Sequence, residues 1–76
     1  MAMRTKNSFE YGDDAKAYVE RFVTEVPQTT YAITLNIKDK AFSKIHRITV
    51  LRILRQLKEE GSIRGRKKGR LYLWYK

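Results

Sequence analysis

The stretch 48–61 constrains the fold of this 76-residue chain more than any other. On a helical wheel of about 100° per residue, its aliphatic side chains gather on one side and long polar side chains lie opposite. The aliphatic set, which must face the core, is Val50, Ile53, Leu54 and Leu57. The pattern predicts a helix over 48–60, ended by Gly61, since glycine readily adopts the left-handed conformation found just after a helix.

Two short β-type stretches follow Gly61. Residues 62–66 and 70–75 are separated by Lys67, Lys68 and Gly69, a tight basic connection. In the second stretch, Leu71 and Leu73 alternate with Tyr72 and Trp74, as strand side chains do. This arrangement predicts a β-hairpin.

The first half of the chain predicts two helices with a strand between them. Apolar residues recur at helical spacing over 13–26, with Asp13 as the N-cap and Pro27 as the stop. Residues 29–35 are rich in β-branched and aromatic side chains, which predicts a short strand. Asn36 is expected to cap a short helix over 37–44, followed by a turn over 44–47.

The predicted order is therefore helix, strand, helix, helix, strand, strand, an α+β fold. Two helices joined by a tight turn make a helix-turn-helix unit, and the hairpin adds a wing. The early strand can pair with the hairpin in a three-stranded antiparallel sheet. We expect one domain over 13–76, preceded by a flexible basic N-terminal arm over 1–12.

The positive charge is concentrated in the second half. The net charge is +9, yet residues 1–26 sum to −1, whereas residues 38–76 carry 13 basic and three acidic side chains. Solubility alone does not require one sign in one half, so the asymmetry favours a polyanionic partner. We expect an intracellular protein, since no apolar run could span a bilayer and no signal peptide is evident.

The residue types present do not indicate an enzyme. The chain has no Cys and one His, and its acidic pairs fit helix ends better than a cleft. We therefore expect no enzyme, no metal or cofactor, and no small-molecule substrate.

The exposed side of helix 48–60 carries side chains suited to base edges in the major groove of DNA. Arg can donate two hydrogen bonds to guanine, Gln can pair with adenine, and Thr or Ile can contact the thymine methyl group. Thr49 and Arg52 are the leading base readers, because the N-terminal part of a recognition helix reaches deepest. Arg55 could instead hold a phosphate, and both arginines could simply form a solvated helix face. The predicted DNA-binding set of this helix and turn is Lys44, His46, Arg47, Thr49, Arg52, Arg55 and Gln56.

The connection between the hairpin strands is the strongest local signal for nucleic-acid binding. Residues 64–70 contain five cations, namely Arg64, Arg66, Lys67, Lys68 and Arg70. Gly65 and Gly69 allow the backbone to turn and approach a ligand closely. Such a wing can lie along a phosphate ridge or insert Arg into the minor groove. A nuclear-localisation signal is a minor alternative.

Residues 49–63 resemble the third helix and first wing strand of winged helix-turn-helix transcription factors. The shared features are a Thr-Val start, two Leu three positions apart, a Glu-Glu-Gly end and an aliphatic strand entry. The size, the lack of Cys and the basic wing resemble in particular the small regulators of crenarchaeal viruses and virus-plasmid hybrids. The second helix is shorter and more basic than usual in that family, and the turn over 44–48 lacks the usual Gly.

Three functions remain open on the residues alone. The favoured one is a sequence-specific regulator of transcription that binds double-stranded DNA as a homodimer. The second is a non-specific architectural or chromatin-like DNA-binding protein. The third is an interaction module whose basic face docks on an acidic protein.

Overall fold

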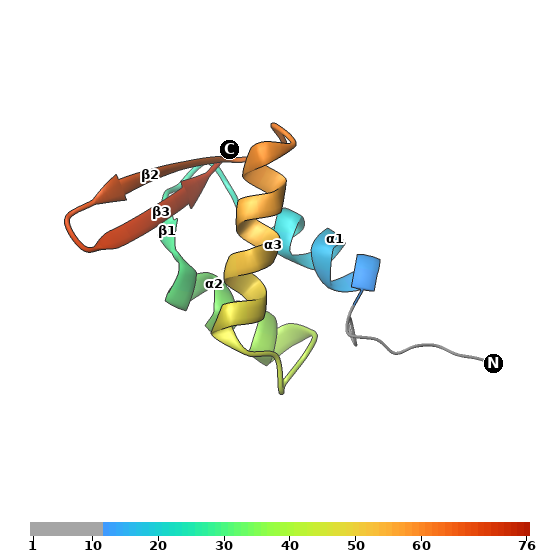
Figure 1. Cartoon of the computed structure of the whole chain (residues 1–76). Helices are drawn as coiled ribbons and strands as arrows, with labels where there is room; N and C mark the ends of the chain where they lie inside the picture. The colour runs from blue at the N-terminus through green and yellow to red at the C-terminus, as the bar shows by residue number, and fades with distance from the viewer. Residues whose placement is uncertain (1–11) are drawn as a thin grey trace.

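The computed structural model, which describes residues 12–76, has three helices and a three-stranded antiparallel sheet (Figure 1). The elements are α1 (Gly12–Phe22), β1 (Gln28–Thr29), α2 (Thr30–Lys40), α3 (Arg47–Glu59), β2 (Arg64–Lys68) and β3 (Leu71–Tyr75). The sheet order is β1-β3-β2. This confirms the predicted α+β class and element order, which are consistent with winged helix-turn-helix topology. The predicted arm over 1–12 falls almost entirely outside the described residues.

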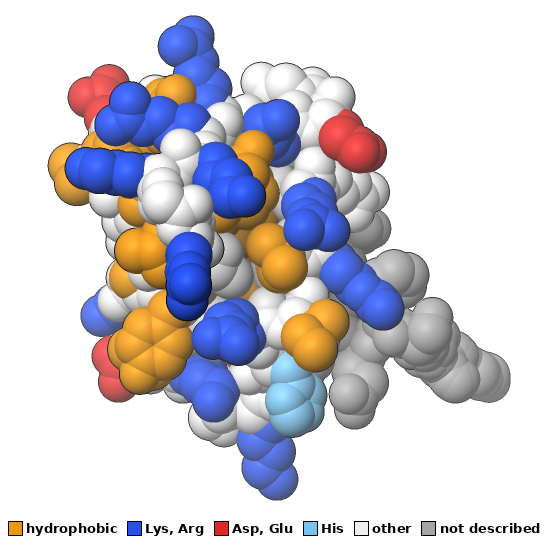
Figure 2. All heavy atoms as spheres, turned by 60° about the vertical axis from the view of Figure 1, so that its left-hand side comes forward, with side chains coloured by type: hydrophobic (Ala, Val, Ile, Leu, Met, Phe, Trp, Pro, Cys, Tyr) orange, Lys and Arg blue, Asp and Glu red, His pale blue; other side chains and the backbone are white. Residues whose placement is uncertain are grey.

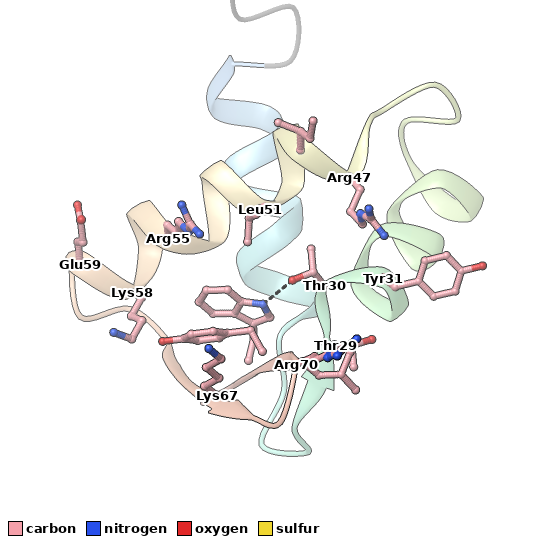
Figure 3. A pocket seen from close by; sticks show the side chains of 14 residues that line it. Thr29, Thr30, Tyr31, Arg47, Leu51, Arg55, Lys58, Glu59, Lys67 and Arg70 are labelled. Carbon is pink, nitrogen blue, oxygen red and sulfur yellow. Dashed lines mark hydrogen bonds between the residues drawn. The ribbon is translucent and has the colours of Figure 1, made fainter.

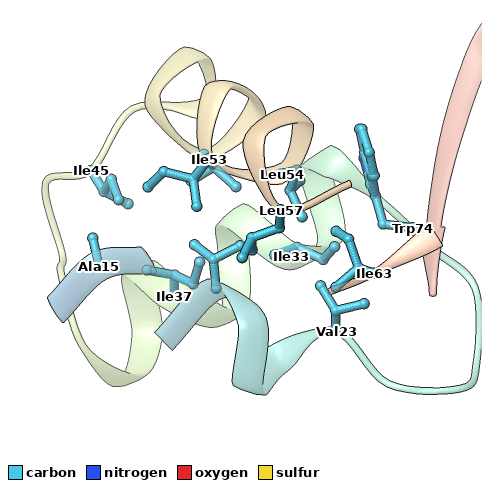
Figure 4. Close-up of a cluster of buried hydrophobic side chains, with 12 residues drawn as sticks. Ala15, Val23, Ile33, Ile37, Ile45, Ile53, Leu54, Leu57, Ile63 and Trp74 are labelled. Atoms are coloured by element: carbon cyan, nitrogen blue, oxygen red, sulfur yellow. The ribbon is translucent and has the colours of Figure 1, made fainter. Parts of the chain in front are cut away.

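One hydrophobic core joins the three helices to the sheet. α3 lies between the β2–β3 hairpin on one side and α1 on the other (Figure 1), and its predicted apolar side is buried. Burying this aliphatic area is the main force holding the domain together. Figure 4 shows the cluster, whose members are Ala15, Val19, Val23, Ile33, Ile37, Ile45, Val50, Ile53, Leu54, Leu57, Ile63 and Trp74.

The predicted strand over 29–35 is wrong, because most of it is helix. Only Gln28 and Thr29 pair with β3, and α2 begins at Thr30. The Thr29 hydroxyl accepts a hydrogen bond of 3.1 Å from the backbone N–H of Ala32, which satisfies a free donor in the first turn. Ile33 and Ile37 are both buried, one helical turn apart, so tertiary packing overrides the β propensity of this stretch.

The limits of the other helices also differ from the prediction. α2 ends at Lys40, so the helix over 37–44 is wrong, and its predicted cap Asn36 lies inside α2. α1 begins at Gly12, which places Asp13 in the first turn, and it ends at Phe22 rather than near Pro27. α3 begins one residue early, so Arg47 belongs to the helix and not to the turn.

The hairpin is confirmed, but its turn lies further along the chain than predicted. β2 runs to Lys68, so Lys67 and Lys68 are strand residues, and the turn consists of Gly69 and Arg70. Gly69 has φ +63°, and Gly61, as predicted after a helix, has φ +84°. Both values lie in the left-handed region that favours glycine.

Candidate nucleic-acid interface

A groove runs between α3 and the β2–β3 hairpin (Figure 3). Arg47, Leu51, Arg55 and Lys58 line the helix wall at spacings of four, four and three residues, which is one helical stripe. Ile48 and Glu59 complete that wall. The hairpin wall and the floor are formed by Lys67, Arg70, Leu71, Tyr72, Trp74 and the segment 29–31.

The floor of the groove is held by the chain's single Trp. Trp74 is 1% exposed, and its Nε1–H donates to the Thr30 hydroxyl at 2.9 Å, which ties β3 to the start of α2 (Figure 3). The Tyr72 ring stacks on Trp74 with centroids 4.6 Å apart. Gly65 of the neighbouring strand lies against both rings, since a Cβ there would stand 2.6 Å from Tyr72. The groove therefore rests on closely packed, hydrogen-bonded side chains.

The charge in the groove is almost entirely positive. Arg47, Arg55, Lys58, Lys67 and Arg70 line it together with one acidic residue, Glu59. Within the described part of the chain, none of these five cations lies within 4.0 Å of a carboxylate. Figure 2 shows the face that includes the hairpin, where Lys and Arg surround apolar side chains and acidic groups lie at the edges. Unneutralised cations around a concave surface concentrate positive potential, which attracts a polyanion.

The structure divides the predicted base readers of α3 between two flanks. Arg55 lines the groove, whereas Thr49, Arg52 and Gln56 do not. Gln56 lies on the flank that faces α1: its amide donates to Glu60 Oε2 at 3.4 Å, and Lys16 of α1 pairs with the same oxygen at 2.7 Å. The Arg52 side chain is exposed. On the helical wheel it falls between the two flanks.

The hairpin cations are divided in the same way by the pleat of the strand. Successive side chains of a strand point to opposite faces. Tyr72 and Trp74 face the groove, and Lys67 and Gly65 are their partners across the ladder. Arg64 and Arg66, whose partners across the ladder are Tyr75 and Leu73, are therefore directed to the outer face of the sheet. Lys68 stands at the end of β2, opposite Leu71, and does not line the groove. Of the five predicted wing cations, Lys67 and Arg70 line the groove and the other three do not.

The predicted site residues Lys44 and His46, which precede α3, do not line the groove. Lys44 and His46 are exposed in the connection between α2 and α3, and only their neighbour Arg47 reaches the groove. His46 occupies the N-cap position of α3, but its side chain makes no capping hydrogen bond.

Lys58 and Tyr31 are groove residues that the sequence reasoning missed. Lys58 lies three residues beyond Arg55 and eleven beyond Arg47, so the helical repeat could have revealed it. The helical repeat does not indicate Tyr31, because the sequence predicts a strand over the segment that contains it.

Comparison of the chain with family models, with curated proteins and with solved structures returns no significant match. Among residues 12–76, no helix is long and apolar enough to cross a membrane. The same residues hold no cluster of three or more His, Cys, Asp or Glu that could bind a metal ion.

Proposed function

We propose that this protein is a sequence-specific regulator of transcription that binds double-stranded DNA. The observation that supports the proposal is the gathering of unneutralised cations from α3 and the hairpin around one groove. In the proposed complex, α3 lies in the major groove and the hairpin contacts the adjacent backbone or minor groove. A phosphodiester strand then passes between them.

The dimensions and side chains of α3 suit this role. A helix with its side chains is about 10–12 Å wide, and the major groove of B-form DNA is about 12 Å wide. Arg52 and Arg55 are exposed and long enough to fork onto guanine O6 and N7. Arg47, Lys67 and Arg70 are assigned to phosphates, since they stand on facing walls of the groove.

Selection of bound duplexes from a random pool tests the proposal. We expect an enriched duplex to bind at least about 10³-fold more tightly than a random one at physiological salt. A homodimer should show two half-sites about 10 bp apart, or a multiple of that, and the mass of the complex should equal two chains per duplex. A binding ratio near one would instead favour the architectural DNA-binding protein, and no DNA binding at all would favour the module for acidic proteins.

Two variants separate base reading from phosphate contact. Arg52→Ala should weaken binding to the enriched duplex by about 1–3 kcal/mol and relax the preference at one base pair. Lys67→Ala should weaken enriched and random duplexes alike and lower the slope of log K against log salt by about one. Arg21→Ala on α1 removes an exposed charge away from the groove and should change neither quantity. If Arg52→Ala behaves like Arg21→Ala, α3 is not the reading helix.

A further inference from the structure

Ile48 is an aliphatic side chain left uncovered among the cations of the groove. It lies in the first turn of α3, directly after Arg47, and is 65% exposed. Single exposed apolar residues are ordinary on protein surfaces. Here, however, Ile48 lines the same groove as Leu51 and the 57% exposed Leu71. Contacts to phosphates alone need no aliphatic group at this position.

The major groove of DNA offers one apolar group at the base edges, the C5-methyl of thymine. Side chains in the first turns of a recognition helix are the ones that reach base edges. We propose that Ile48 is a specificity-determining residue that selects thymine through its methyl group. This inference rests on the proposed function, since it requires α3 to lie in the major groove.

Other apolar or methyl-bearing side chains are less suited to this contact. Leu51 is half-buried against the core, and Thr49 is half-buried on the opposite flank of α3. Leu71 belongs to the hairpin, which in the proposed complex contacts the backbone or the minor groove. Thymine presents no methyl group there, so Leu71 cannot read it from that side.

Replacement of thymine by uracil in the enriched duplex tests the inference, because it removes only the methyl group. Single replacements along each strand should identify one or two positions at which wild-type affinity falls. The expected loss is about fourfold per contacted methyl, which corresponds to roughly 0.8 kcal/mol for one buried CH₂-sized group. The remaining thymines should tolerate the change.

Variants then assign the methyl contact to a side chain. Ile48→Ala should bind the thymine duplex about as weakly as wild type binds the uracil duplex, and should not distinguish the two. Val26→Ala is the matched control: Val26 is 67% exposed but does not line the groove, so this variant should keep the full discrimination. Leu71→Ala should keep it as well. Because Ile48 is exposed, Ile48→Ala should melt at the wild-type temperature, which circular dichroism would verify.

The possible failures are distinguishable. If a duplex is enriched but wild type tolerates uracil at every position, the thymine contact is refuted and the proposed function stands. If Ile48→Ala loses affinity on uracil replacement as strongly as wild type does, another side chain reads the methyl and the assignment is wrong. If the random pool yields no enriched duplex, both the proposed function and this inference fail.

Discussion

Gly65 supports the groove floor by having no side chain. Its φ is not in the left-handed region, so an L-residue could adopt its backbone conformation. The obstacle is space: a Cβ would stand 2.6 Å from Tyr72 Cε1 and 2.9 Å from two ring carbons of Trp74. Neither ring can move freely, because the two are stacked and Trp74 is buried and hydrogen-bonded to Thr30.

The substitution Gly65→Ala should therefore destabilise the fold. Overpacking costs about 1–3 kcal/mol, and a strained Trp74–Thr30 hydrogen bond costs about 0.5–1.5 kcal/mol more. Alanine recovers about 0.5–1 kcal/mol, because glycine loses more backbone entropy on folding. The net loss of about 2 kcal/mol lowers the melting temperature by roughly 8–16 °C in a domain of this size.

Thermal unfolding followed by circular dichroism measures this loss, and fluorescence follows the ring itself. Since Trp74 is the chain's single Trp, its emission should shift to longer wavelength if the ring moves toward solvent. Arg66→Ala, at the exposed neighbouring position, should stay within about 0.5 kcal/mol of wild type. A Gly65→Ala protein with the wild-type melting temperature and emission would show that the rings do not pack against Gly65 as described.

Three further changes test contacts of the fold. Thr30→Val keeps the side-chain shape but leaves the buried Trp74 N–H without an acceptor, so we expect a loss of about 1–3 kcal/mol in urea unfolding; no loss would mean that the hydrogen bond is absent in solution. Gly61→Ala places a Cβ on a residue with φ +84° and should lower the free energy of unfolding by about 1–2 kcal/mol. Gly61→Asn should lower it less, because Asn tolerates the left-handed region better. Equal losses for the two variants would contradict a conformational cause. Lys16→Ala removes the 2.7 Å ion pair between Lys16, whose side chain is 29% exposed, and Glu60, whose side chain is 42% exposed. The loss of folding free energy should be below about 1 kcal/mol and should shrink at high salt. A larger loss that does not depend on salt would contradict a screened surface ion pair.

The sequence pattern predicted the secondary structure correctly where core packing and the intrinsic propensity of the residues favour the same element. The aliphatic residues of α3 recur at helical spacing and are buried, and Gly61 ends the helix region as predicted. Over 29–35 the two influences disagree. β-Branched and aromatic residues favour a strand, but Ile33 and Ile37 bury against the helical core only if the segment is helical.

The sequence indicated the elements that carry the candidate site, but not which of their side chains share the groove. The sequence placed most of the residues predicted to bind DNA on the third helix and the hairpin. The structure brings Arg47, Arg55, Lys67 and Arg70 to one groove but turns several other candidates away from it. No local pattern gives the rotation of a helix against a hairpin, since that angle is set by how the core side chains pack.

By itself the sequence determined the amphipathic third helix, the hairpin and the excess of positive charge in the second half. These follow from the period of the apolar residues and from charge counting, which need no contact between distant segments. The tertiary structure alone decided where the second helix begins and which cations share a groove. The pairing of Gly65 and Lys67 with Trp74 and Tyr72 is the clearest case. Because strand side chains alternate, a shift of that register by one residue would have turned Lys67 outward and Arg66 into the groove.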